Sequence, residues 1–110
     1  MALSTAVLKF ATVNFNALID AGATMAGLSN QEVASQILKL LPRTSPLQGV
    51  VYFEVAANAW YLINRRGRQW PLGSSPIHES DAFVYFDESR CRGADMKLNS
   101  NATAVLTIGS

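Results

Sequence analysis

The pattern of hydrophobic and polar positions is clearest between residues 49 and 70, where two apolar runs, VVYFEVA and AWYLI, flank a short break of small and polar residues. Both runs are rich in Val, Ile, Tyr, Phe and Trp, which suit the pleated, half-buried surface of a sheet. Ala57 and Asn58 favour a turn between them. The basic segment 64–68, NRRGR, favours a second turn, in which Gly67 can adopt a positive φ. The pattern therefore predicts a meander of strands.

Three further strands are predicted after this meander. They cover residues 81–86 (DAFVYF), 94–98 and 102–108 (ATAVLTI), while two prolines and a glycine make residues 69–80 an irregular crossing segment between sheets. Turns recur roughly every 8–12 residues from residue 49 onward, which is typical of a β-sandwich or small barrel. We therefore expect a mainly β, antiparallel domain with one short helix and a β core over residues 49–108.

That helix is predicted at residues 29–41. Ser29 fits the N-cap and Glu32 the third helical position, which together make a capping box. Pro42 ends the helix. The apolar positions recur with the spacing of a single helical face: Val33, Ile37, Leu40 and Leu41. We expect a three-turn helix that packs this face against the sheet.

Residues 2–21 fit two patterns. Val13 and Phe15 belong to an alternating series typical of a strand, and a passable helical stripe also runs through Leu3, Val7 and Phe10. The content of Val, Thr and Phe favours strands. We therefore expect residues 1–22 to form edge strands or an N-terminal arm.

The composition points to one domain with few charges. The chain has 110 residues, 49% hydrophobic and 15% charged, against about 25% charged residues in typical soluble domains. Either the surface is rich in Ala and Ser, or part of it meets another protein. The net charge of +1 gives no overall field for nucleic acid or an anionic membrane. No apolar run is long enough to span a bilayer, and no basic region precedes an apolar block as in a secretory signal.

No catalytic signature is found, so we expect a protein that is not an enzyme and has no catalytic, metal or cofactor site. His78 is the only histidine, and although Glu79 and Asp81 are close in sequence, a loop histidine in water is the simpler interpretation. Cys91 is the only cysteine, which excludes an internal disulfide and a cysteine-based zinc cluster within one chain. No serine lies in a G-x-S-x-G motif.

Basic and aromatic residues alternate around the second turn of the meander. Such a combination could bind single-stranded nucleic acid, stack on sugars, or form a protein interface, where Arg and Trp are enriched. Because the net charge is only +1, we rank a protein interface above nucleic acid. The candidate interface residues, here and near the N-terminus, are Arg65, Arg66, Arg68, Trp70, Phe10 and Phe15.

The order of segments over residues 49–108 resembles that of the small β-sandwich virion proteins of tailed bacteriophages. The resemblance covers the meander, the basic turn, WPLG at 70–73, FVYF at 83–86 and the terminal ATAVLTI. Many proteins of this kind are head decoration or minor capsid proteins. It is a resemblance of pattern, without a site motif, so no functional residue is carried over.

This resemblance implies a capsid decoration or cement subunit. Such a protein would bridge major capsid proteins in the virion, after assembly in the host cytoplasm, as a homo-oligomer and most often a trimer. Binding of this kind would stabilise the shell by mass action. Two alternatives stay open: a carbohydrate-binding module of a tail or baseplate, with Trp60, Tyr61, Trp70 and Tyr85 exposed, and a small nucleic-acid-binding β-barrel that uses the arginines.

Overall fold

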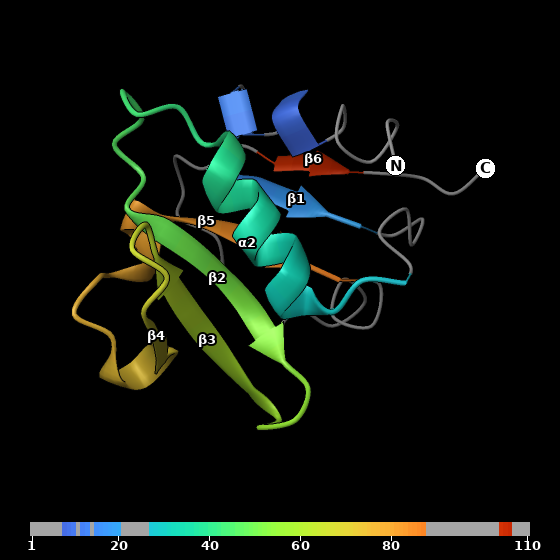
Figure 1. Ribbon diagram of the computed structural model, residues 1–110, viewed down its shortest axis with the longest axis vertical. Helices are drawn as coiled ribbons and strands as arrows, with labels where there is room; N and C mark the ends of the chain where they lie inside the picture. The colour runs from blue at the N-terminus through green and yellow to red at the C-terminus, as the bar shows by residue number, and fades with distance from the viewer. Residues whose placement is uncertain (1–7, 11, 14, 21–26, 88–103, 107–110) are drawn as a thin grey trace.

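The computed structural model describes residues 8–10, 12–13, 15–20 and 27–87, together with the backbone of residues 104–106. It is a mixed α/β domain in which the described strands form one sheet and the helix α2 lies across one face of it (Figure 1). The helix α2 is Asn30–Leu40. The strands are β1 (Ala17–Ile19), β2 (Gly49–Glu54), β3 (Ala59–Asn64), β4 (Gln69–Pro71), β5 (Ala82–Phe86) and β6 (Ala104–Leu106).

The sheet has two parts with different strand directions, in the order β4-β3-β2-β5-β1-β6. The strands β2, β3 and β4 form the predicted antiparallel meander. In contrast, β5 is parallel to both β2 and β1, and β6 is parallel to β1. The prediction of an antiparallel sheet is therefore wrong for this half. Parallel strands need a crossover connection, and α2 provides one between β1 and β2. A sandwich or barrel is not seen among the described strands and stays a prediction.

Both faces of the sheet are apolar. All residues of β5 are buried, and so are all residues of β2 except Glu54. Parallel strands that are covered on both faces have such continuous apolar runs. On the α2 face the core contains Val33, Ala34 and Ile37 of the helix with Leu18, Val50, Tyr52, Ile63, Phe83 and Tyr85. On the opposite face it contains Ala17, Val51, Leu62, Ala82, Val84 and Phe86.

The helix α2 forms as predicted. The backbone N–H of Glu32 donates to Oγ of Ser29 at 3.1 Å, and the backbone N–H of Ser29 donates to Oε1 of Glu32 at 2.8 Å, so the capping box is confirmed. Hydrogen bonds to its carboxylate, first from the backbone N–H of Ser29 and then from the Ser29 side chain, lower the pKa of Glu32. The helix ends at Leu40, with Leu41 as its C-cap before Pro42. Its start and end therefore follow from local chemistry.

The segment before β1 corrects the sequence prediction. Residues 8–10 and 12–13 are helical, and only Ala17–Ile19 form a strand. Leu8 and Thr12, one turn apart, are buried, and the Thr12 hydroxyl lies 3.0 Å from the carbonyl of Lys9 and 3.4 Å from that of Leu40. The helical spacing of Leu8 and Thr12 thus buries one face of this segment, whereas its β propensity had favoured strands. The strand β1 lies between β5 and β6, so it is neither an arm nor an edge strand.

The two predicted turns are confirmed, and one strand was missed. Asn58 has φ 50° in the β2–β3 turn, and Gly67 has φ 86° in the β3–β4 turn. Residues 69–71, predicted as irregular, form β4, where Pro71 is tolerated because the strand is at the edge of the sheet. Short 3-10 helices follow at Leu72–Ser74 (η1) and Glu79–Asp81 (η2). Residues 94–98 and Cys91 lie outside the described residues.

Candidate functional site

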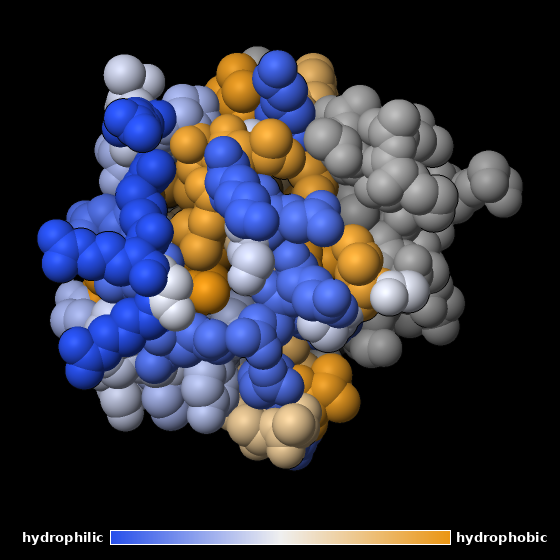
Figure 2. Space-filling view, in the orientation of Figure 1, coloured by the Kyte–Doolittle hydropathy of each residue, from blue (hydrophilic) through white to orange (hydrophobic). Residues whose placement is uncertain are grey.

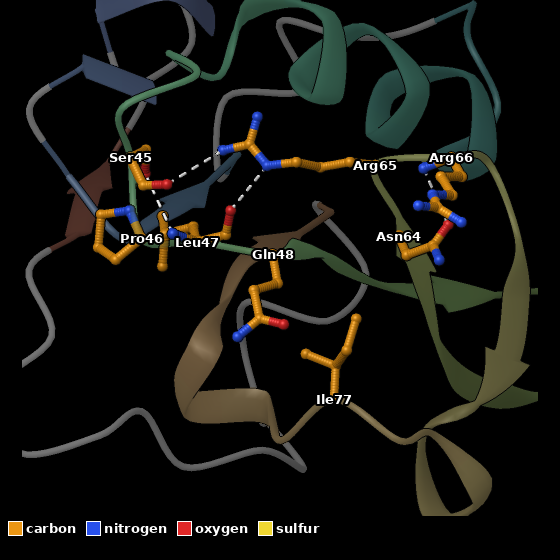
Figure 3. A pocket seen from close by; sticks show the side chains of 8 residues that line it. All are labelled: Ser45, Pro46, Leu47, Gln48, Asn64, Arg65, Arg66 and Ile77. Carbon is orange, nitrogen blue, oxygen red and sulfur yellow. Dashed lines mark hydrogen bonds between the residues drawn. The ribbon is translucent and has the colours of Figure 1, made fainter.

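A pocket of about 270 Å³ lies at the end of the sheet where β2 and β5 begin (Figure 3). The α2–β2 connection forms one wall, and the β3–β4 turn forms another. The lining residues are Ser45, Pro46, Leu47, Gln48, Asn64, Arg65, Arg66 and Ile77. Their side chains supply both aliphatic and polar surface. The pocket is smaller than most small-molecule sites, which have volumes of about 300–1,000 Å³.

The guanidinium group of Arg65 is fixed by carbonyl groups of the α2–β2 connection. Its Nε donates to the carbonyl of Leu47 at 3.0 Å, and its Nη2 donates to the carbonyls of Pro42 at 3.0 Å and Ser45 at 3.4 Å. Figure 3 shows the bonds to Leu47 and Ser45, with the remaining nitrogen facing away from these carbonyls. That nitrogen, Nη1, has no partner among the described residues. Arg65 thus links two segments and keeps one donor group free.

The β3–β4 turn is held by Asn64. Its Oδ1 accepts hydrogen bonds from the backbone N–H groups of Arg66 at 3.0 Å and Arg68 at 2.8 Å. The N–H of Gly67 donates to the carbonyl of Asn64 at 2.9 Å, and the left-handed φ of this glycine closes the turn. The turn therefore holds the backbone of Arg65 in place at the pocket.

The neighbouring arginines are less restrained than Arg65. Arg43, Arg66 and Arg68 are all exposed, and Arg68 lies over the ring of Trp70 at 5.4 Å from its centroid. Within the described ranges, none of these arginines forms an ion pair with a carboxylate. Figure 2 shows hydrophilic residues on the left of the view, where the α2–β2 connection and the β3–β4 turn lie.

Carboxylates occupy the opposite end of the parallel strands. Asp20 follows β1 and is only 2% exposed; Asp87 follows β5. The Tyr85 hydroxyl lies 3.5 Å from Oδ2 of Asp20, and burial, followed by the charge of Asp20, raises the pKa of Tyr85. Asn30 donates from Nδ2 to Oδ2 of Asp87 and to the carbonyl of Phe53 at 2.9 Å. These bonds join the ends of three strands to the start of α2.

Burial also affects a second tyrosine. Tyr52 is fully buried, and its hydroxyl donates to Oε1 of Gln69. Burial, with smaller contributions from Glu54 and Tyr61, raises the pKa of Tyr52 to about 12. Tyr52 therefore stays neutral in the folded protein well above neutral pH and joins the α2 face of the sheet to β4.

The residues considered for catalysis do not come together in the described part of the chain. His78 is exposed, and its Nδ1 accepts from the backbone N–H of Ser80 at 3.1 Å, so it caps η2. No group of three or more His, Cys, Asp or Glu residues suited to a metal ion is present within the described ranges. Of the helices searched there, none combines the length and apolar character required to cross a bilayer.

The four aromatic residues considered for sugar stacking lie on two faces of the sheet. Trp60 and Trp70 pack on the face opposite α2, whereas Tyr61 and Tyr85 pack on the α2 face. Trp60 also makes edge-to-face contacts with Phe53 and Phe86, with ring centroids 5.5 and 5.6 Å apart. The four rings do not form one surface.

An exposed apolar group lies near the N-terminus. Phe10 and Val13 are 54% and 58% exposed and are one helical turn apart. The rings of Phe10 and Phe15 are in contact, with their centroids 5.5 Å apart. The two phenylalanines named as interface candidates are thus brought together, far along the sequence from the candidate arginines.

Sequence reasoning identified the basic turn but missed the rest of the pocket. Gln48 and Ile77 belong to connecting segments without a motif, and only the fold brings them to Arg65. The buried role of Asp20 was also missed. A usable signal was present, because Asp20 and Asp87 each directly follow an apolar strand segment, a position that can bring polar groups together at one edge of a parallel sheet.

No known protein family, curated protein or solved structure matches this chain.

Proposed function

We propose that this chain is a non-enzymatic structural protein that binds other protein subunits, and specifically a decoration subunit of a bacteriophage capsid. It would assemble as a homo-oligomer, most simply a trimer, and bridge major capsid proteins of the virion. The resemblance over residues 49–108 motivates the virion part of the proposal. The resemblance also implies a sandwich or barrel, a finer description that remains part of the proposal.

The exposed apolar group of Phe10 and Val13 is the observation that supports this proposal most directly. Both side chains are more than half exposed, and together with Phe15 they form an apolar surface. In a chain with only 15% charged residues, such a surface is a candidate contact with another protein. Burying it would stabilise an assembly by removing apolar area from water.

The arginines at the pocket end give this protein a second possible contact. Arg66 and Arg43 are exposed and have no carboxylate partner within the described residues. Arginine suits pairing with carboxylates because its planar fork can donate two parallel hydrogen bonds. A subunit that bridges two neighbours needs two such surfaces.

The two alternative functions have less support. A sugar-binding platform would use Trp60 and Tyr61, which pack on opposite faces of the sheet. Binding of single-stranded nucleic acid would need a positively charged surface, and the net charge of the chain is only +1. We therefore favour a protein interface over both.

The test measures the mass of the purified protein and its binding to capsids. We expect a homo-oligomer by light scattering after gel filtration, and co-sedimentation with expanded capsids of a phage that encodes this chain. Neighbouring genes for a major capsid protein or a capsid protease would identify that phage. A strictly monomeric protein that stays in the supernatant would sink the proposal.

Two exposed valines provide a matched comparison. Val13→Ser removes apolar area from the proposed contact, whereas Val55→Ser makes the same change in the β2–β3 turn, at a residue that is 68% exposed. We expect Val13→Ser to reduce the oligomer or the capsid-bound fraction and Val55→Ser to leave both unchanged. Equal losses in the two variants would contradict a role for the Phe10–Val13 surface.

A further inference from the structure

We propose that the Arg65 pocket binds an aliphatic side chain of a partner protein together with a carboxylate next to it in the partner sequence. The inference rests on the proposed function, because it takes the ligand to be part of another protein. The partner presents an acidic residue, Asp or Glu, adjacent to Leu, Ile, Val or Met.

The Arg65 side chain is exposed and keeps its charge accessible. Three of its donor contacts are made to the carbonyls of Pro42, Ser45 and Leu47. A guanidinium group has five N–H donors, so the two on Nη1 are left for a ligand. Carbonyl groups satisfy donors without neutralising the charge. Arg65 therefore presents a positive charge and an open donor group on an exposed side chain.

Hydrogen bonds fix the Arg65 side chain before any ligand binds. A free arginine loses side-chain entropy when a ligand fixes it. The carbonyl bonds have already fixed Arg65 when the protein folds, so less entropy remains to be lost on binding. Arg66, in the same turn, makes its observed hydrogen bond through the backbone N–H alone and lacks this advantage. Among the arginines of this region, Arg65 is therefore the one best prepared to bind an anion.

The pocket combines aliphatic and polar surface. Pro46, Leu47 and Ile77 supply aliphatic surface, and Gln48 lies between Arg65 and Ile77 in Figure 3. A volume of about 270 Å³ suits one or two side chains better than a whole cofactor. A bare anion would leave the aliphatic surface without a contact, and a purely apolar side chain would leave Nη1 without a carboxylate. An aliphatic side chain together with a carboxylate contacts both the aliphatic surface and Nη1.

One acidic residue of this chain lies near the pocket. Asp81 lies at this end of the sheet, because its carbonyl accepts from the backbone N–H of Gln48 at 2.7 Å. Its side chain is exposed and forms no ion pair with Arg65. Asp81 therefore reduces the local positive potential without occupying the donor group on Nη1.

The test is a titration of the ¹⁵N-labelled full chain, followed by nuclear magnetic resonance. The probe is the blocked dipeptide acetyl-Leu-Glu-amide. Acetyl-Leu-Gln-amide removes the charge, acetyl-Gly-Glu-amide removes the aliphatic side chain, and inorganic phosphate offers charge alone. We expect acetyl-Leu-Glu-amide to shift the side-chain amides of Gln48 and Asn64 and the Nε signal of Arg65. Each of the other probes should bind at least about fivefold more weakly, because each lacks one of the two contacts.

Two variants locate the site. Gln48→Glu adds a carboxylate to the pocket without touching the Arg65 bonds, and we expect it to weaken binding at least about tenfold through repulsion and competition for Arg65. Arg65→Lys should weaken binding as well, since an ammonium group cannot hold the carbonyls and a ligand with the same geometry. Arg68→Ala is the control: it removes one charge from the same turn at a residue outside the pocket lining, and binding should stay within about twofold.

The result separates this inference from the proposed function. Equal binding of the Glu and Gln dipeptides, stronger shifts of the same signals by phosphate, or equal losses in Gln48→Glu and Arg68→Ala would overturn the inference. Capsid binding by the Gln48→Glu variant at the level of the unmodified chain would leave the proposed function standing and remove the pocket from it. Dipeptide binding by a chain that does not bind capsids would leave the dipeptide-binding pocket standing and contradict the proposed function.

Discussion

At one end of the parallel strands, Asp20 is buried and Asp87 is half-buried, and both have hydrogen-bond partners within the protein. At the other end, Arg65 is exposed and keeps a free donor group. Both ends use polar groups to join segments that are distant in the sequence. At the carboxylate end the polar groups bond to one another, and these bonds stabilise the fold. At the Arg65 end the same kind of bonding leaves charge at the surface, where a second molecule can reach it.

The largest expected effect is in alkaline solution, because two buried tyrosines, one of them in contact with Asp20, stay neutral in the folded protein. Tyr85 contacts Asp20, and both Tyr85 and Tyr52 have raised pKa values, with Tyr52 at about 12. In the unfolded chain both tyrosines lose their protons near pH 10, about two pH units before Tyr52 does in the folded protein. Above about pH 10 the unfolded state therefore binds fewer protons than the folded state, and stability falls as pH rises.

The measurement is the free energy of unfolding by urea at a series of pH values. It should be insensitive to the tyrosines below about pH 10 and should fall from there through about pH 12, because Tyr52 and Tyr85 must be ionised in the unfolded chain first. Absorbance at the tyrosinate band reports the ionisation independently. A free energy of unfolding equal at about pH 9 and about pH 11.5 would contradict the buried, neutral state of both tyrosines.

Replacing one carboxylate at each end of β5 makes the comparison directly. Asp20→Ala empties a buried position and removes the partner of Tyr85, and we expect a loss of about 3 kcal/mol in the free energy of unfolding. Asp81→Ala, at the exposed end, should change it by less than about 0.5 kcal/mol. Urea unfolding measures both. If the two variants lost similar amounts of free energy of unfolding, the burial of Asp20 would not make it more important for stability than the exposed Asp81.

Gly49, at the start of β2 beside the pocket, packs closely against the backbone of β3. A Cβ on Gly49 would lie 2.5 Å from the backbone carbonyl oxygen of Ile63, which no side-chain rotation can relieve. We expect Gly49→Ala to cost about 2 kcal/mol. Gly73→Ala is the control, because a Cβ there meets no atom within 4 Å. Thermal unfolding should show a lower midpoint for Gly49→Ala alone. An equal fall in the midpoint of Gly73→Ala would argue against a close contact between Gly49 and the Ile63 carbonyl.

The smallest expected effect concerns the structural bonds of Arg65. Arg65→Ala removes hydrogen bonds to three carbonyls, all at an exposed side chain, and should cost about 1 kcal/mol. Arg66→Ala removes the same charge but keeps its backbone bond to Asn64, so we expect no measurable change. Denaturant unfolding of both variants gives the answer. A loss as large in Arg66→Ala would show that the carbonyl bonds do not stabilise the protein.

The parts of the fold that were predictable from sequence are those set by neighbouring residues. Ser29 and Glu32 define the start of α2 by bonding to each other, and Gly67 marks a turn by its backbone freedom. The meander follows because short turns join antiparallel neighbours. Each of these signals lies within a few residues of the structure it predicts.

The parallel half of the sheet depends on contacts between residues distant in sequence. Ala17 pairs with Val84 and Ala104, and no local pattern indicates such pairing. One signal is present in the sequence: residues 82–86, AFVYF, are aliphatic or aromatic throughout, which is typical of a strand buried on both faces.

The candidate site was predictable only in part, for the same reason. The basic turn at residues 64–68 is visible in the sequence, but its function in the pocket depends on carbonyl groups of residues 42–47 and on Ile77. Backbone carbonyls carry no sequence signature. The difference between Arg65 and Arg66 therefore becomes clear only in the structure.

The place of β1 in the sheet has a consequence for the order of folding. Both of its neighbours, β5 and β6, follow it by long stretches of chain, so on a ribosome β1 is made long before either partner. The meander β2–β3–β4 can pair as soon as it emerges, because its contacts are local. Closing the parallel half requires distant segments to meet, which is slow in small domains. We therefore expect the meander to gain protection from hydrogen exchange first during refolding, and β1 to gain it last.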